Sequence, residues 1–356
     1  MVGGVGTNDT FVDSETALAL SVLKQIPADE SSVISPVSIS LALALLHAGA
    51  NGETKDQINK VLVNGGDDSD LKSNYGKLAA AAKNSENGVI VNIVNRLFTE
   101  EFANMNEKEI ELKFFEVFSG NVSLNAKFID DIRLNYQAGA QAVNFEEREQ
   151  AAAAINDFAD TTTSGKIKKL VSPDDMKDAI AFLVNAVYFQ AEWLEKFDKN
   201  SSMELEFESN ENSSRKIEFL NDYGVDRGYA ENDLFQLLSL PYADTSFSFV
   251  IFLPKEKFAL KAALDTDLKE CLEAVGLTKV FSDDANFSNI ASNAKITSGI
   301  HKAVIEVDED GTTAAAASAF KASLECMQET IDFTANHPFL FALVKEKHIF
   351  FLGIHA

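Results

Sequence analysis

The amino-acid sequence predicts an α+β fold, with mixed helices around a large, mostly antiparallel β-sheet. Segments with the apolar spacing of helices crowd the first half of the chain, and short runs typical of strands dominate the second half. The two kinds of segment do not alternate as in repeated βαβ units, so a purely parallel sheet is not expected. The 356 residues include no linker rich in proline, glycine or serine, and we therefore expect one domain spanning residues 1–356.

Helices are indicated where apolar residues recur three and four positions apart. Residues 31–50 remain apolar on all sides, which indicates a buried helix that begins near Ser31. Residues 70–84 are polar with one face of alanines, as in a helix at the surface. The other predicted helices are residues 15–27, 54–63, 123–135, 150–163 and 267–275.

Strands are indicated by short apolar runs between turn residues. Residues 180–189 are apolar almost without interruption, which is typical of a strand buried on both faces of a sheet. Residues 234–240 and 247–253 flank a turn that contains Pro241. Further strands are predicted at residues 89–98, 140–145, 305–307, 337–341 and 349–353.

The composition excludes several classes of function. A formal net charge of -24 would repel nucleic-acid phosphates and anionic membranes, so neither is expected as a partner. P-loop, G-x-S-x-G and H-E-x-x-H motifs do not occur, and the 2 cysteines and 5 histidines are scattered, so we expect no enzyme activity, metal or cofactor. The first residues lack a cationic start and an apolar core, and we therefore expect a cytoplasmic protein.

The stretch from Val307 to Met327 permits two structures. Its run of alanines favours an exposed helix, which a threonine at its start could cap. Alternatively, it is a loop that can become a strand inside a sheet, where side chains alternate between two faces. The even-numbered residues from Thr312 to Ser318 would then share one face, and all of them are small enough to enter a packed sheet.

Four motifs in a fixed order favour the second structure. The sequence EDGTTA at residues 309–314 precedes HPFLF at residues 337–341. Upstream lie SPVSIS at residues 35–40, NAVYF at residues 185–189 with Trp193 after it, and HKAV at residues 301–304. Together these motifs resemble those of the serpin family over most of the chain. The resemblance implies the serpin fold, with two smaller sheets beside the main sheet and an exposed reactive loop at about residues 309–336.

The resemblance also assigns roles to individual residues. It puts Trp193 at the breach, the end of the main sheet where the loop enters. It implies a polar cluster under the middle of that sheet, whose hydrogen bonds must part when the sheet opens: Ser35, Ser38, Asn185 and His301. The hinge that would enter the sheet comprises Glu309, Gly311, Thr312, Thr313, Ala314, Ala315, Ala316 and Ala317.

A serpin of the inhibitory kind acts as a suicide substrate, and the expected partner is therefore a serine protease. The protease cuts the reactive loop and forms an acyl-enzyme, and the loop then inserts into the main sheet and traps it. The resemblance implies a metastable monomer. We expect no heparin control, because residues 70–84 carry only Lys72, Lys77 and Lys83 as basic residues. Two alternatives stay open: inhibition of caspases or papain-like cysteine proteases, and a non-inhibitory chaperone, carrier or storage role.

The reactive bond has two candidate positions. Counting forward from Gly311 with the usual family spacing puts the bond between Glu325 and Cys326. Counting back from Pro338 puts it after Met327. The first position resembles intracellular serpins that inhibit granzyme-B-like proteases, which accept acidic residues, and we prefer it.

Two segments depart from the family pattern. The chain is longer than the pattern between Phe98 and Val122, and shorter between Pro254 and Leu277. The shorter segment normally supplies an edge strand of the main sheet, with a lysine that pairs with the acid aligned here as Glu309. The sequence offers no candidate for that lysine, and a thinner main sheet is expected.

We predict that Glu325→Ala slows the inhibition of a protease with acidic preference at least about tenfold, or about 1.4 kcal/mol in the transition state. The expected loss follows from removing the side chain that the protease recognises at the cut. Rate measurements compare variant and wild type, and mass spectrometry identifies the released C-terminal peptide. A peptide that begins at Gln328 would move the bond to Met327 and overturn the assignment.

Overall fold

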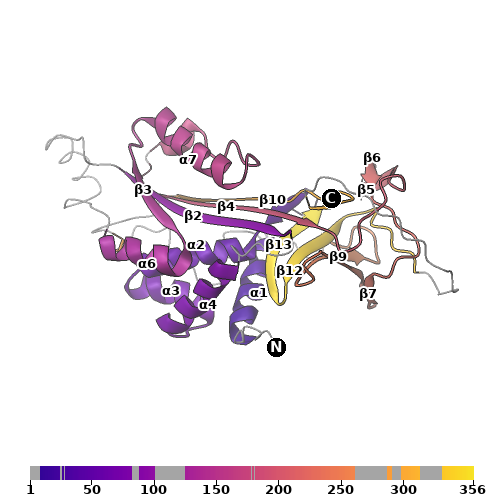
Figure 1. Cartoon of the computed structure of the whole chain (residues 1–356), viewed down its shortest axis with the longest axis horizontal. Coiled ribbons are helices and arrows are strands. Elements are labelled where there is room, and N and C mark those ends of the chain that lie inside the picture. Colours follow the sequence, from indigo (N-terminus) through magenta and orange to yellow (C-terminus); the bar gives the residue numbers. More distant parts are fainter. Residues whose placement is uncertain are drawn as a thin grey trace.

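The computed structural model describes residues 9–24, 26–27, 29–81, 88–100, 125–177, 179, 181–260, 287–290, 298–312 and 331–356. In this part of the chain, a five-stranded sheet lies between two helical layers (Figure 1). Helix α7 crosses one face of the sheet, and the other helices cover the opposite face. A second, six-stranded sheet continues the core away from α7.

Most described helices begin and end within three residues of the predicted positions, but the first helix begins six residues and ends four residues before its predicted range of 15–27. Their bounds are α1 (Asp9–Leu23), α2 (Pro36–Gly49), α3 (Gly52–Val63), α4 (Asp68–Ala81), α6 (Ala126–Tyr136) and α7 (Arg148–Thr162), with a 3₁₀ turn η1 (Pro173–Met176). The helix expected at residues 267–275 lies outside the described residues.

The expected start of the buried helix at Ser31 is wrong. Residues Ser32–Ile34 form strand β1, which pairs with the last strand of the chain, and α2 begins only at Pro36. The Ser35 side chain caps the helix by accepting a hydrogen bond from Ser38 N, and proline at the first helical position lacks an N–H that would need a partner. The polar break at Ser35 therefore separates a strand from a helix.

The five-stranded sheet has the order β10–β4–β2–β3, with β11 also paired to β4. Its strands are β2 (Ile90–Glu100), β3 (Gly139–Val143), β4 (Ala181–Glu192), β10 (Ser298–Val304) and β11 (Gly311–Thr312). Strand β4 runs antiparallel to β2 and β11 but parallel to β10. Both β10 and β11 pair with the edge of β4 that β2 leaves open, at different positions along it.

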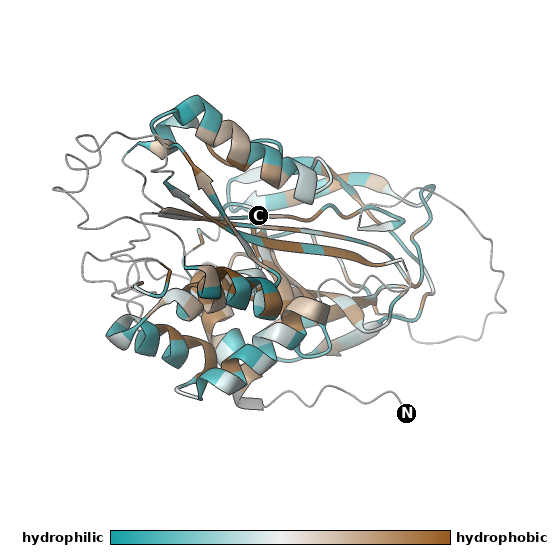
Figure 2. Ribbon diagram, turned by 60° about the vertical axis from the view of Figure 1, so that its left-hand side comes forward, coloured by the Kyte–Doolittle hydropathy of each residue, from teal (hydrophilic) through white to brown (hydrophobic). Residues whose placement is uncertain are grey.

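Strand β4 is buried on both faces, as its apolar run predicts. Leu183, Val187 and Phe189 face the core shared with α2 and α6. Phe182 and Val184 face the opposite way, toward α7. The central strands are accordingly hydrophobic, while the outer helix faces are hydrophilic (Figure 2).

The remaining strands form an antiparallel sheet of order β1–β13–β12–β9–β8–β7 and a separate pair, β5–β6. The bounds are β5 (Met203–Asn210), β6 (Ser213–Phe219), β7 (Gly228–Glu231), β8 (Phe235–Pro241), β9 (Phe247–Pro254), β12 (Phe339–Lys345) and β13 (His348–His355). The sequence predicted β8, β9, β12 and β13 but missed β5, β6 and β7, because these strands are largely exposed and lack an apolar run.

We predict that Gly353→Ala lowers the free energy of unfolding by about 1–3 kcal/mol. A methyl group at Gly353 would lie 2.4 Å from the Ser32 carbonyl oxygen and 2.4 Å from the Phe341 ring, so β1 or the ring must shift. Gly139→Ala is the control, since its methyl group would meet nothing closer than Arg96 Nε at 3.6 Å. Urea denaturation of both variants decides, and equal midpoints would contradict the prediction.

Candidate functional site

A hydrogen-bonded polar cluster lies between α2 and the five-stranded sheet, and it contains Ser35, Ser38, Asn185 and His301. The Ser38 hydroxyl donates to Asn185 Oδ1 over 2.9 Å, and the Asn185 amide donates to the Ser38 carbonyl oxygen over 2.8 Å. The His301 ring also bonds to Asn185 Oδ1 through Nδ1. Residues far apart in the sequence are thus joined through one buried asparagine.

The partners of His301 determine which of its nitrogens carries the proton. The backbone N–H of Ser35 donates to His301 Nε2 over 2.9 Å, so Nε2 is the acceptor and Nδ1 carries the hydrogen. Burial lowers the pKa of His301 from 6.5 to about 4. The neutral ring therefore connects β10 both to β4 and to the residue that caps α2.

Asn95 belongs to this cluster, although the sequence analysis missed it. It is the register partner of Asn185 on β2, and its Oδ1 accepts a hydrogen bond from the Asn185 amide over 2.5 Å. A polar residue in the middle of a predicted strand was the only signal available. The cluster therefore spans β2, β4 and β10, and it includes the His301–Asn185 contact that would break if the sheet opened between β4 and β10.

The segment expected to act as the hinge pairs with the C-terminal end of β4. Gly311 pairs with Glu192, and Thr312 pairs with Ala191. Thr312 has no exposed surface, and its hydroxyl forms a hydrogen bond of 2.7 Å with the Tyr242 hydroxyl. Because burial raises the pKa of Tyr242 well above its usual value, this phenol stays protonated.

Trp193 and Tyr242 form a pair of stacked aromatic rings at the C-terminal end of β4, where the breach is expected. Their rings stack with centroids 4.5 Å apart, and the Trp193 indole N–H donates to the Asp308 carbonyl oxygen over 2.8 Å. Trp193, expected here from its motif, is buried. Tyr242 was not singled out from the sequence, because its contact with Thr312 joins residues 70 positions apart.

The start of the loop differs from the expectation of an exposed segment beginning at residue 309. Asp310, Gly311 and Thr312 are buried. Glu309, for which no lysine partner was found, accepts a hydrogen bond from the Ser202 hydroxyl over 2.6 Å. The lysines here contact its neighbour Asp310 instead. Thr313, Ala314, Ala315, Ala316, Ala317, Glu325, Cys326 and Met327 lie outside the described residues.

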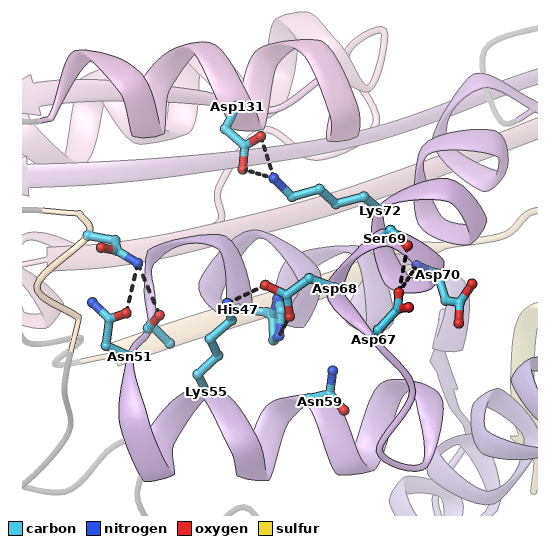
Figure 3. Close-up of polar contacts among 12 residues, drawn as sticks. His47, Asn51, Lys55, Asn59, Asp67, Asp68, Ser69, Asp70, Lys72 and Asp131 are labelled. Carbon is cyan, nitrogen blue, oxygen red and sulfur yellow. Dashed lines mark hydrogen bonds and ion pairs between the residues drawn. The ribbon is translucent and has the colours of Figure 1, made fainter.

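A second polar network joins α3 and α4 to α6 (Figure 3). Lys72 binds both carboxylate oxygens of Asp131, at 2.7 and 2.8 Å, and Lys55 pairs with Asp68. Burial lowers the pKa of His47, next to Asp68, to about 4. Lys72 of α4 is one of the three lysines considered for heparin binding, and its charge is thus neutralised by Asp131.

The described residues contain no group of three or more histidine, cysteine, aspartate or glutamate side chains arranged to hold a metal ion. None of the helices in the same part of the chain combines the length and apolar character that a membrane span needs.

Comparison with known proteins identifies the fold and the family. The family model "Serpin (serine protease inhibitor)" matches residues 13–265 and 257–356. The chain therefore belongs to the serpin family.

Similar proteins cover nearly the whole chain. Serine protease inhibitor 42Dd of Drosophila melanogaster is 28% identical over 93% of this chain and 92% of its own length. Serpin B6 of Macaca fascicularis is 27% identical over 95% of this chain and 96% of its own. The crystal structure of Serpin48 of Tenebrio molitor, described as a highly specific serpin, superposes with a TM-score of 0.82 at 23% identity, covering 99% of each chain.

We predict that the folded protein loses about 2 kcal/mol of stability between pH 7 and pH 5 through His301 alone. The folded pKa of about 4 lies below the ordinary value of 6.5, so the unfolded chain takes up the proton first as the pH falls. The contribution of the neutral ring is thus full above pH 6.5 and is lost on the way down to pH 4.

Denaturation curves of His301→Gln at both pH values test this, because the variant should lose that part of the pH dependence. His47→Gln should remove a separate share of similar size, because burial also lowers the pKa of His47 to about 4. If His301→Gln keeps the full slope of the wild type, the prediction is wrong.

Proposed function

We propose that this serpin inhibits serine proteases by loop cleavage and insertion into the five-stranded sheet, trapping the acyl-enzyme. The observation that carries the proposal is the pairing of β11 with β4. It gives the loop a direction and a register on the same edge of β4 that β10 occupies.

The register defines what further insertion would pair. Since Gly311 faces Glu192 and Thr312 faces Ala191, each following loop residue would pair with the preceding residue of β4. Continued to the start of β4, this pairing brings Ala322 opposite Ala181. The inserted strand would then run over residues 311–322.

The same register predicts which face each inserted side chain would occupy. Ala314 would lie opposite Phe189, and Ala316 opposite Val187, both in the core shared with α2. Small side chains suit that core because it is already packed. Ser318 would lie opposite Asn185, where a hydroxyl can join the polar cluster.

Insertion along β4 would require β10 to leave it. Strand β10 pairs with Phe182 to Tyr188 of β4, positions that the entering strand would need. The hydrogen bond between His301 and Asn185 would break in the process. This is the basis on which we assign a sheet-opening role to Ser35, Ser38, Asn185 and His301.

The chemistry would be supplied by the protease. Its serine attacks the carbonyl carbon of Glu325, the bond to Cys326 nitrogen breaks, and that nitrogen leaves as a new amino terminus. Inserting the loop before water attacks the ester would carry the enzyme away from its active geometry. Because Gly311 and Thr312 are already paired, insertion of residues 313–322 would add ten ladder positions. At about 1 kcal/mol each they would supply about 10 kcal/mol, comparable to the stability of a whole domain. The intact protein would then be a kinetic trap.

The finer assignment, a granzyme-B-like protease, rests on Glu325 at the preferred bond. The test uses a panel of serine proteases with acidic, basic and hydrophobic preference, together with a caspase and a papain-like enzyme. A complex that survives SDS identifies the class that is trapped. Nicking between Ser318 and Met327 should also raise the thermal midpoint by tens of degrees. If no protease of the panel forms such a complex and the midpoint is unchanged after nicking, the proposal is rejected.

We predict that Ala316→Arg converts the inhibitor into a substrate, cleaved without a lasting complex. Its side chain would have to enter the core beside Val187, where an unpaired charge costs several kcal/mol. Ala316 is preferred to Thr312, because Thr312 is already buried and its replacement would also disturb the intact protein. Ile331→Arg is the control: Ile331 is 61% exposed and follows both candidate bonds. Gel densitometry gives the ratio of complex to cleaved protein, and an unchanged ratio would contradict the prediction.

A further inference from the structure

Asp310 carries a buried carboxylate at the point where the loop joins the sheet. The residue is 5% exposed. Its Oδ2 lies 2.6 Å from Lys199 Nζ, and its Oδ1 lies 3.6 Å from Lys196 Nζ. Lys196 also pairs with Glu192 over 3.0 Å. Hydrogen bonding to Lys199 lowers the pKa of Asp310, so the carboxylate is charged at neutral pH.

Both lysines belong to the segment that directly follows β4, and this segment holds the hinge along its backbone as well. Trp193 N–H donates to the Asp310 carbonyl oxygen over 3.0 Å, and Phe197 N–H donates to the Glu309 carbonyl oxygen over 2.9 Å. The hinge is therefore fixed at two points: by the ion pairs of Asp310, which precedes the first ladder position, and by the Thr312–Tyr242 hydrogen bond at the second.

Gly311 allows this close approach. Its φ of +153° lies in the range that residues with a side chain rarely adopt. A Cβ atom there would lie 2.1 Å from the Ala191 carbonyl oxygen, which is backbone and cannot be moved cheaply. Any other residue would force the hinge away from β4.

We infer that Asp310, Lys196 and Lys199 hold a preformed nucleus for loop insertion. Starting a new strand is the slow step, because conformational freedom is lost before many contacts compensate for it. Here the first two pairs already exist in the uncut protein, so insertion begins as elongation. The inference rests on the proposed function, because it names the residues that position the loop for insertion. Insertion is the step that competes with hydrolysis of the acyl-enzyme.

The nucleus predicts a specific kinetic defect. If Asp310 loses its charge, β11 should separate from β4 more often, and insertion should start later after the cut. More acyl-enzyme would then be hydrolysed before it is trapped. We expect Asp310→Asn to at least double the number of inhibitor molecules consumed per trapped protease, while the rate of loop cleavage stays the same.

Two measurements on the uncut protein test the clamp independently of any protease. Amide hydrogen exchange at Thr312, which pairs with Ala191 of β4, should be faster in Asp310→Asn. The fluorescence of Trp193 should also change, and it is a clean signal because the chain has one tryptophan. Raising the salt concentration should shift the wild type in the same direction, since the side chain of Lys199 is 55% exposed and its pair is open to screening.

The matched variants separate charge from general damage. Exchanging the two charges in the double variant Asp310→Lys, Lys199→Asp should restore slow exchange and efficient trapping. Glu231→Gln removes the ion pair between Glu231 on β7 and Lys255, in which the oxygen–nitrogen distance is 2.8 Å. This variant should change neither the hydrogen exchange nor the efficiency of trapping. Gly311→Ala should reproduce the defect of Asp310→Asn without altering any charge.

The outcomes are distinct. Unchanged hydrogen exchange and fluorescence in Asp310→Asn would overturn the inference, even if the wild type inhibits. Faster trapping by Asp310→Asn would also overturn it, since the contact would then restrain the loop instead of starting its insertion. If the wild type traps no protease, the proposed function fails. The nucleus is then still tested by the rate at which Trp193 fluorescence changes after a nick, which should be slower in Asp310→Asn.

Discussion

The edge of β4 that faces β10 and β11 is the constraint on which the rest of the structure depends. A strand can pair with one neighbour at each position along an edge, and β4 uses this edge for two strands of opposite direction. Strand β10 occupies the middle, and β11 occupies the C-terminal end. Any lengthening of β11 must therefore displace β10, so the two states of the sheet exclude each other.

The polar cluster lies under the positions where that exchange would occur. A buried asparagine is favourable only when its hydrogen bonds are satisfied. Asn185 achieves this with groups from α2, β2 and β10 together. An apolar residue at position 185 would pack without depending on β10. The asparagine instead makes the closed sheet conditional on His301 and supplies polar groups that an entering hydroxyl can satisfy.

Whereas the polar cluster can part, the breach is held together by aromatic packing and ion pairs. Trp193 and Tyr242 form a rigid floor, and Asp310 is fixed above the C-terminal end of β4 by two lysines. Rigid support at this end and a separable seam under the middle of β4 suit a strand that enters from one end only. This arrangement gives the proposed insertion its direction.

Much of this architecture follows from local sequence. The continuous apolar run of β4 determined its burial on two faces, and the helical periodicity of α3, α6 and α7 determined those helices. The serpin motifs in the sequence are sufficient to single out Ser35, Ser38, Asn185, His301 and Trp193. What these residues contact is a different matter, because a contact depends on both partners.

Only the tertiary structure decided the contacts made over long sequence distances. Strand β1 has three residues and exists because β13 lies beside it, so its sequence alone resembled the start of a helix. Asn95, Tyr242 and Lys199 are ordinary residues in the sequence, and they acquire roles through strand register and chain reversal. The burial of Thr312 in the uncut chain was equally hidden, since local propensity describes a residue's own conformation and not which strand edge is free to receive it.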